Sequence, residues 1–226
     1  MIEDDSSTPT AAENCFCVVS IQTTGLDPKS GKIVEIAVAK VEMESGDISL
    51  LANYIINAKN ISSNAWIFQN STLTPEMVRN GKDLIEVRPQ LQEIFDKYLL
   101  IAYSQDFVFP FLKAAGLTVP NPLDNPMEVA APIVQIPTYS VEKDPDSTYN
   151  RAVLYEKFGC EADFSYDAYD YDDVDEEELK WPTFQEAWEH YCGGYPHEVH
   201  RAEKDVFLAA ELMWKMVESG DYTIDT

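Results

Sequence analysis

Apolar residues recur in three closely spaced segments near the start of the chain, and polar or turn-forming residues separate these segments. The segments are rich in Val, Ile and Leu, and the connections between them are short. Short runs of this composition predict β-strands, and short connections between consecutive strands favour antiparallel pairing. The sequence therefore predicts a three-stranded antiparallel meander over residues 15–22 (CFCVVSIQ), 32–43 (KIVEIAVAKVEM) and 48–56 (ISLLANYII).

Further along the chain, the apolar spacing changes to that of helices. Apolar residues recur every three or four positions through residues 86–98, which predicts a helix with one buried face. A helix start is indicated at Thr74, a good N-cap residue that Pro75 follows, and a stop is indicated at Gly81. Helices are also predicted over residues 106–116, 148–159 and 200–220.

A buried strand is predicted at residues 99–103 (LLIAY), between two helical segments. Residues 117–145 contain six prolines, and because proline lacks a backbone N–H, they permit at most a short helix or strand near residues 127–136. Strands that alternate with helices predict an α/β fold in which helices cover both faces of one sheet. Residues 1–13 are predicted to form a disordered acidic and polar tail.

The net charge of the chain limits the classes of molecule that it can bind. Lys and Arg number 16 against 40 Asp and Glu, so the net charge is −24. Such a chain repels phosphate backbones, and it has no basic run of the kind that holds DNA or RNA, so direct nucleic-acid binding is not expected. It shows no membrane-length apolar run and no secretory signal pattern, so we expect a cytoplasmic protein without membrane contact and with reduced cysteines.

Three short sequence motifs occur along the chain, and their order and spacing are informative. They are SIQTTGL at residues 20–26, YSQDFVFPFL at residues 103–112 and HRAEKD at residues 200–205. In order, spacing and flanking residues they resemble the three motifs of the DEDDh-type (DnaQ-like) 3′–5′ exonucleases. The likeness extends over residues 15–218, nearly the whole chain, which makes it more specific than any single motif.

The resemblance implies a single domain with a ribonuclease H-like fold. Its central mixed sheet would have five strands, namely the antiparallel meander of three strands plus parallel strands, with helices on both faces. The exonuclease-like domain would cover residues 14–220, and residues 221–226 would form a tail.

In that family, four carboxylates hold two divalent metal ions and a histidine acts as general base. On the resemblance, the four carboxylate positions are occupied here by Ser20, Gln22, Val108 and Asp205, and the histidine position by His200. A hydroxyl and an amide are poor ligands for Mg²⁺ or Mn²⁺, and valine supplies no ligand. We therefore predict no catalytic residues, no metal site and no cofactor, with His200 and Asp205 left as remnants.

Other acidic residues do not replace the missing carboxylates. Asp106 would point away from the second motif position, Asp27 lies beyond the glycine turn, and Glu35 holds a position that the family keeps acidic without using it as a principal metal ligand. His200 and Asp205 also have a structural interpretation, which we favour. In it, His200 precedes the long helix and Asp205 lies in the first turn, where the helix dipole favours an acidic residue.

An acidic and aromatic segment precedes the third motif. Residues 161–178 (EADFSYDAYDYDDVDEEE) hold ten acidic residues and no basic one, interleaved with four aromatic rings. Acidic blocks are usually solvated loops, but a purely solvating block has no use for four rings. Rings and carboxylates together could bind an arginine-rich surface. We place this insertion at residues 161–180, and its predicted partner-binding residues are Asp163, Asp167, Tyr169, Asp170, Tyr171, Asp172, Asp173, Asp175, Glu176, Glu177 and Glu178.

These observations predict a catalytically inactive, exonuclease-like acidic protein that binds a basic nucleic-acid-binding protein. It would block RNA or DNA binding by charge mimicry, because its carboxylates fall at spacings comparable to those of phosphates. The partner could be an RNA-processing nuclease or an RNA degradation complex, with a viral inhibitor as one concrete instance, and a homodimer is compatible with the sequence. Two alternatives stay open: a metal-dependent 3′–5′ exonuclease with unusual ligands, and a passive structural pseudo-enzyme subunit.

Overall fold

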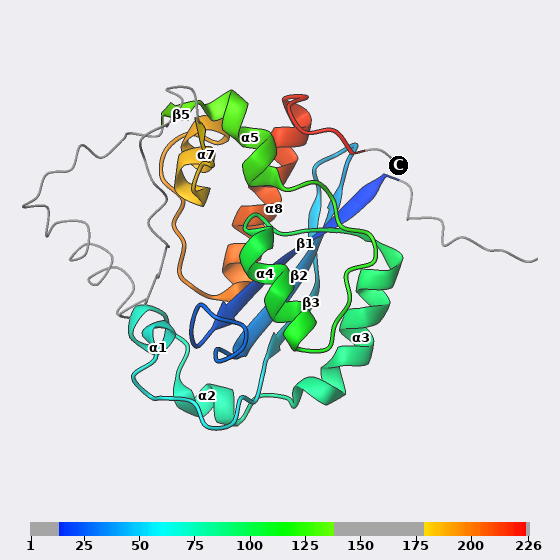
Figure 1. Cartoon of the computed structure of the whole chain (residues 1–226). Helices are drawn as coiled ribbons and strands as arrows, with labels where there is room; N and C mark the ends of the chain where they lie inside the picture. The colour runs from blue at the N-terminus through cyan, green and yellow to red at the C-terminus, as the bar shows by residue number, and fades with distance from the viewer. Residues whose placement is uncertain (1–13, 138–178, 225–226) are drawn as a thin grey trace, which may run out of the picture.

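The computed structural model of the chain describes residues 14–137 and 179–224, and a four-stranded mixed sheet lies at its centre (Figure 1). Three strands form the predicted antiparallel meander, and the fourth pairs with the first in parallel, which gives the order β3-β2-β1-β4. The strands are β1 (Cys15–Thr23), β2 (Ile33–Glu42), β3 (Ile48–Ile55) and β4 (Leu99–Ile101).

The fifth strand of the predicted sheet is reduced to a bridge at the edge of β4. The backbone N–H of Leu100 donates to the carbonyl oxygen of Asn121 at 2.9 Å, and the carbonyl oxygen of Leu100 accepts from the N–H of Leu123 at 2.9 Å. Pro120 and Pro122 have no N–H to donate, so a continuous ladder cannot form there. The predicted α/β class and the mixed sheet are confirmed, with the last strand only partly paired.

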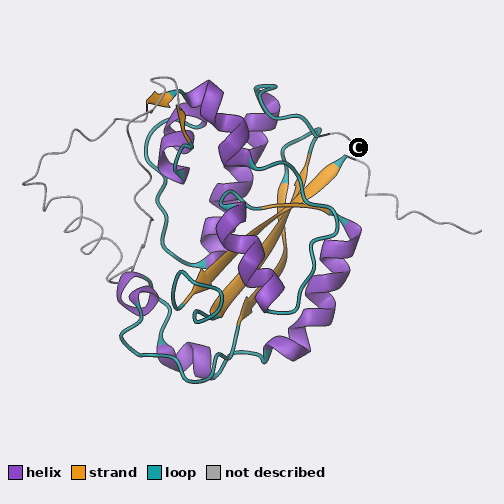
Figure 2. Ribbon diagram, in the orientation of Figure 1, coloured by secondary structure: helices purple, strands orange, loops and turns teal. Residues whose placement is uncertain are grey.

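Helices cover both faces of this sheet (Figure 2). The longest helix, α8, packs on one face, while α3 and α4 pack on the other. The helices are α1 (Trp66–Asn70), α2 (Pro75–Arg79), α3 (Leu84–Lys97), α4 (Gln105–Ala114), α5 (Pro126–Val134), α7 (Phe184–Tyr191) and α8 (Ala202–Glu218), and the short strands β5 (Ile136–Pro137) and β6 (Leu179–Lys180) pair with each other.

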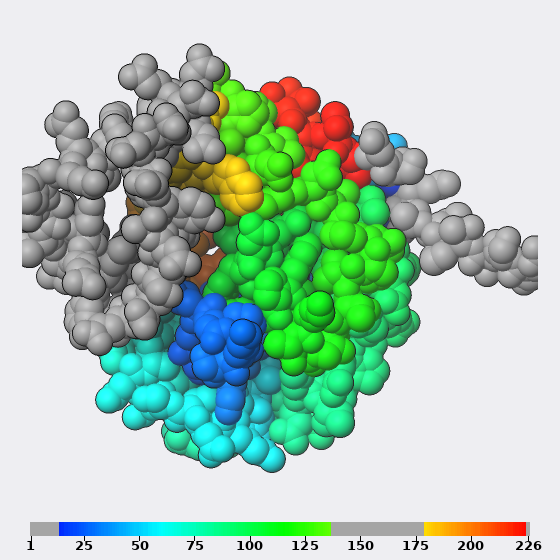
Figure 3. All heavy atoms as spheres, in the orientation of Figure 1, coloured from blue at the N-terminus to red at the C-terminus, as the bar shows by residue number. Residues whose placement is uncertain are grey.

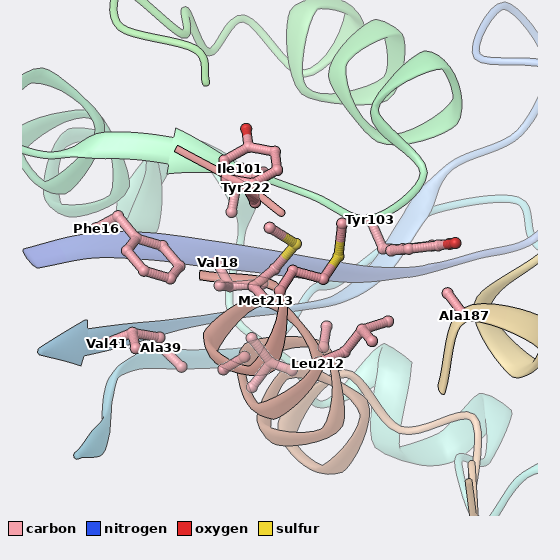
Figure 4. Packing of buried hydrophobic residues seen from close by; sticks show 14 of the residues in the cluster. Phe16, Val18, Ala39, Val41, Ile101, Tyr103, Ala187, Leu212, Met213 and Tyr222 are labelled. Carbon is pink, nitrogen blue, oxygen red and sulfur yellow. The ribbon is translucent and has the colours of Figure 1, made fainter. Parts of the chain in front are cut away.

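Successive residues of β1 enter two different hydrophobic cores. Phe16 and Val18 pack on the side of α8, where Figure 4 shows them beside Met213. Cys17 and Val19 point the other way, into the core formed with α3 and α4. Because both faces of β1 are buried, its sequence is a continuous apolar run instead of an alternating one.

The short helix α2 begins where the sequence predicts. The hydroxyl of Thr74 accepts the backbone N–H of Met77 at 3.1 Å, and Pro75 occupies the first helical position. Gly81 lies just beyond the helix, and a Cβ atom there would come within 2.6 Å of the carbonyl oxygen of Ile55. Glycine is therefore required at this position by close backbone contact with the end of β3.

Several elements are absent from the sequence-based prediction, namely α1, α7 and the pair of β5 and β6. The proline-rich region forms α5, where a short helix or strand was allowed. Asn125 caps this helix by accepting the N–H of Met127 at 3.1 Å, and Pro126 takes the first helical position, which needs no N–H donor.

The packed part of the chain continues past residue 220, where the sequence analysis ends the domain. Tyr222 is buried. Its backbone N–H donates to the carbonyl oxygen of Met216 at 3.0 Å, and its hydroxyl donates to the carbonyl oxygen of Asp124 at 2.6 Å. These contacts hold the residues after α8 against the loop that precedes α5.

Some predictions concern residues outside the described ones: the tail at 1–13, the helix at 148–159 and the acidic segment at 161–178. In the described ranges, no helix is both long and apolar enough to cross a membrane. Cys17 and Cys192 are free thiols, and burial raises the pKa of each.

Candidate functional site

The carboxyl end of β1 carries two polar residues, Ser20 and Gln22, on the face that α8 covers. They share this face with Phe16 and Val18 because side chains alternate along a strand. The amide Nε2 of Gln22 donates to Oδ2 of Asp205 at 2.9 Å, and Asp205 lies in the first turn of α8. The first and third sequence motifs therefore meet in space.

Asp205 is buried, with only 8% of its surface exposed, and both of its carboxylate oxygens accept a hydrogen bond. Oδ2 accepts from Gln22, and Oδ1 accepts from the backbone N–H of Val199 at 3.2 Å. Burial raises the pKa of the Asp205 carboxyl, and the bond from Val199 and the nearby His200 oppose part of that rise. Asp205 lies in the first turn as predicted, and it also joins α8 to the end of β1.

The second motif contributes no polar group to this site. Val108 of α4 is buried beside Phe111 and Leu112, in the core on the opposite face of the sheet. An apolar side chain fits that core, but it offers no ligand atom. The structure therefore brings together Gln22 and Asp205 and leaves Val108 apart from them.

His200 precedes α8 in the left-handed backbone conformation, with φ of 52°, which residues other than glycine seldom adopt. Its ring packs edge-on against the ring of Trp66 in α1, with the centroids 4.8 Å apart. The prediction that His200 precedes the long helix is confirmed. Its ring contact with α1 is a feature that the sequence analysis missed.

A buried ion pair behind this site was also missed. The guanidinium Nε of Arg201 donates to both carboxylate oxygens of Glu35 at 3.0 Å, and Nη2 donates to Oε1 at 2.7 Å. Oε2 also accepts the backbone N–H of Ala202 at 2.8 Å, and Nη1 donates to the hydroxyl of Thr72 at 3.0 Å. The hydrogen bond to Glu35 raises the pKa of the guanidinium. The available signal was one acidic residue within the apolar run of β2.

A cleft of about 540 Å³ opens beside Gln22, and we call it the β1-end cleft. It lies between the β1–β2 turn and the segment that leads into α1, which are blue and cyan in Figure 3. Leu26, Trp66 and Phe107 supply apolar walls, and hydroxyl and amide side chains supply polar ones. Lys32 also lines it, and none of the described residues that line the cleft is acidic.

The donor atoms at the end of β1 match poorly what a pair of divalent cations needs. Mg²⁺ and Mn²⁺ prefer several hard, charged oxygen ligands. Ser20, Gln22 and Asp205 offer a hydroxyl, an amide and one carboxylate, and the amide NH₂ already donates to that carboxylate. Within residues 14–137 and 179–224, no group of three or more His, Cys, Asp or Glu could hold a metal ion.

The predicted partner-binding residues, from Asp163 to Glu178, lie outside the described part of the chain. The residues that follow them are anchored. The hydroxyl of Tyr103 donates to the carbonyl oxygen of Pro182 at 2.7 Å, and this contact is buried. Thr183 and Glu186 then form a reciprocal capping box at the start of α7.

Part of the chain matches a known family of domains. The family model described as an exonuclease (RNase T) matches residues 22–130. The DNA polymerase III PolC-type protein of Thermotoga maritima is 26% identical over 147 residues, which cover 62% of this chain and 10% of that protein. The PolC-type protein of Clostridium perfringens is 26% identical over 120 residues, covering 53% and 8%. This chain therefore spans at most a tenth of the length of these relatives.

Solved nuclease structures resemble the whole described fold. The nuclease domain of 3′hExo, a DEDDh family member bound to rAMP, gives a TM-score of 0.62 at 12% identity, covering 96% of this chain and 98% of that one. Cell-death related nuclease 4 gives 0.53 at 12% identity, covering 92% and 64%. Exonuclease I of E. coli with a dT13 oligonucleotide gives 0.52 at 12% identity, covering 92% and 41%. At such low identity, the likeness establishes the fold alone.

Proposed function

Residues 22–130 match this exonuclease family model, and the chain has the fold of DEDDh nucleases. We propose that it no longer hydrolyses nucleic acid and acts in the cytoplasm by binding another protein. The observation that carries the proposal is the 2.9 Å hydrogen bond from Gln22 to Asp205. On the motif resemblance, both residues stand where the family places metal-binding carboxylates. Here the amide of Gln22 donates a hydrogen bond to the Asp205 carboxyl group, so one of the two positions presents an N–H donor instead of an anionic oxygen and occupies an oxygen of the other.

The surrounding residues support the loss of hydrolysis. Two cations held close together need carboxylates on several sides to offset their repulsion. Asp205 already accepts hydrogen bonds on both carboxylate oxygens, and burial together with the nearby Asp205 raises the pKa of the Glu198 carboxyl, which disfavours its charged form. The buried carboxylate of Glu35 is already bound by Arg201. Val108 lies in the opposite core. Among the residues that the structure describes, no cluster of three or more His, Cys, Asp or Glu offers a replacement metal site.

The proposed partner is a basic nucleic-acid-binding protein. The chain has a net charge of −24, and residues 161–178 combine ten carboxylates with four rings. Carboxylates at such spacing can occupy arginine and lysine side chains that otherwise hold phosphates, and the rings can stack on the guanidinium groups. A bound chain would then block RNA or DNA from the same surface. A homodimer would present two such segments.

A nuclease assay tests the first half of the proposal. Single-stranded RNA and DNA are incubated with the chain and Mn²⁺, and the variant Asp205→Ala is assayed in parallel. We expect both proteins to give the same background, because no activated water is held. Cleavage by the wild type that Asp205→Ala abolishes would instead favour an exonuclease with unusual ligands.

Capture from a cell lysate tests the second half. We expect the wild-type chain to retain basic nucleic-acid-binding proteins at low salt and to release them at high salt. A variant with the ten acidic residues of 161–178 changed to amides should lose this capture. Replacing the exposed Glu76, Glu86 and Glu93 by Gln provides a control on the folded body. Equal capture by the ten-residue variant would favour the passive structural subunit.

A further inference from the structure

Two hollows flank the β1–β2 turn, residues 24–32, and share one lysine. The first is the β1-end cleft. The second, which we call the turn groove, has a volume of about 250 Å³ and lies between this turn, the end of β3 and the helices α3 and α4. Ile33, Leu84 and Phe111 supply apolar walls of the turn groove, and Lys32 lines both hollows.

The charge around these hollows is opposite to that of the chain as a whole. Lys32 and Lys59 line the turn groove, and no acidic side chain is among the described residues that line either hollow. Lys32 donates from Nζ to the carbonyl oxygen of Lys59. Within the described ranges, neither ammonium group is ion-paired with a carboxylate. An apolar surface with two such lysines suits a ligand that carries both rings and carboxylates.

The position of the turn is fixed by close packing on α4. A Cβ atom on Gly31 would lie 3.1 Å from Cε1 of Phe111 and 3.0 Å from the carbonyl oxygens of Gly25 and Asp27. Glycine at this position therefore lets the turn approach the helix closely. The two lysine-bearing hollows are consequently part of the packed fold.

The chain re-enters the described fold at residue 179, and it then contacts the residue that lies two positions before α4. Pro182 accepts the buried hydrogen bond from Tyr103, just before α4 begins. Within α4, Phe107 lines the β1-end cleft, and Phe111, one turn later, lines the turn groove. The residues that follow the acidic segment are thus held beside the start of the helix that supplies a wall to each hollow.

We propose that residues 161–178 of this chain dock on the β1-end cleft and the turn groove of the same molecule. The rings of the segment enter the apolar hollows, and its carboxylates pair with Lys32 and Lys59. The segment has a long reach from its described end, because Tyr171 precedes Leu179 by eight residues and an extended chain of that length spans about 26 Å. The segment is also the most acidic and ring-rich part of the sequence, so it complements this surface in both respects.

This inference goes beyond the proposed function and can fail separately from it. A basic partner protein could bind residues 161–178 only after displacing them from Lys32 and Lys59. If docking is absent while partner capture still depends on the ten carboxylates, only the docking is wrong. If docking is present and no partner is captured, only the proposed function is wrong.

Zero-length carbodiimide cross-linking of the full chain tests the docking. This reagent joins a lysine to a carboxylate that it touches, and mass spectrometry identifies the pair. We expect cross-links from Lys32 and Lys59 to residues 161–178. Lys97 is the internal control, because it is exposed and lies near Cys15, at the opposite end of β1. In a mixture of unlabelled and ¹⁵N-labelled chains, the linked peptides should carry a single isotopic form.

A ring-free variant separates docking from unspecific attraction. Phe164, Tyr166, Tyr169 and Tyr171 are replaced by Ser, which keeps every carboxylate and every lysine. Cross-linking to Lys32 and Lys59 should fall about tenfold if the rings are buried in the hollows. Unchanged yields, equal yields at Lys97, links only between isotopic forms, or no links at all would each overturn the proposal.

Discussion

Asp205 is the buried carboxylate through which α8 meets the end of β1. Its pKa is raised chiefly by burial, so the protonated form is more favoured in the folded chain than in the unfolded chain. Its contribution to stability is fully present below the pKa of the unfolded carboxyl, about 3.9, and is lost as pH rises through the raised folded value.

Asp205→Asn cannot ionise, so it escapes this loss. We expect the stability of the variant relative to wild type to increase as the pH rises above the unfolded value of about 3.9, up to and through the raised folded pKa of Asp205. Urea unfolding at several pH values measures the difference, and the exposed Glu93→Gln serves as a control. A relative stability that does not change with pH would show that the Asp205 carboxyl is not perturbed in this way.

The ion pair of Glu35 and Arg201 predicts a large loss on substitution. In Glu35→Gln, an amide NH₂ would face the guanidinium, and at least one buried donor would lose its acceptor. Removing one partner of a buried pair costs about 3 kcal/mol. The partly exposed pair of Lys40 and Glu42 gives the matched control, since Glu42→Gln should change stability by less than about 0.5 kcal/mol. Similar losses in the two variants would refute the role of Glu35.

Single-residue roles were predictable where the chemistry is local. Thr74 and Pro75 marked a helix start from their own side chains, and the structure bears this out. The partner of Glu35 was not predictable in the same way, because Arg201 lies 166 residues away in the sequence. A buried acidic residue in a strand indicates that a basic side chain must pair with it, but it does not indicate which one.

The β2–β3 turn contacts α8 through a glycine, and this contact can be tested. Gly46 has φ of 73°, and a Cβ atom there would lie 2.4 Å from Nε1 of Trp214. Gly220 has φ of 82° and no atom within 4 Å of a built Cβ. Alanine at Gly220 should therefore cost only the backbone strain, about 1–2 kcal/mol.

Gly46→Ala should cost more than Gly220→Ala, because the methyl group must also displace the Trp214 ring. Overpacking of this kind adds about 1–3 kcal/mol. Urea unfolding of both variants gives the comparison. Equal losses would mean that the indole moves aside freely and that the turn is not packed on α8.

Elements with a long repeat were predicted better than short ones. The three meander strands and α8 lie within a few residues of their predicted bounds, because each has enough apolar positions to show its period. With five residues in α1 and two in each of β5 and β6, no repeat can appear. The capping residues Thr183 and Glu186 were a usable signal for α7 that the pattern analysis passed over.

At the scale of the whole molecule, the negative charge is spread unevenly along the sequence. The described residues are only mildly acidic, and most of the net negative charge is on the residues outside them. The fold class followed from the order of strands and helices, while the site depended on three motifs that are far apart in the sequence. Only the folded chain shows that two of them meet and that the third does not.

The net charge predicts how the full chain behaves as pH falls. Its sequence isoelectric point is 4.2, and proteins are least soluble where their net charge vanishes. Turbidity measured between pH 3 and pH 8 should therefore peak near pH 4.2. The variant with residues 161–178 neutralised should peak at a higher pH, because ten ionisable acids are removed. An unshifted peak would show that association is governed by something other than net charge.

The covering of β1 and β2 by α8 has a consequence for biosynthesis. The apolar face that contains Phe16 and Val18 is completed by a helix that begins only at Ala202. At about 5–20 residues per second, a ribosome needs roughly 10–30 s to travel from the end of β2 to that helix. During this interval the apolar face of the meander that α8 later covers is exposed to solvent. We therefore expect the nascent chain to bind chaperones that recognise exposed apolar surface.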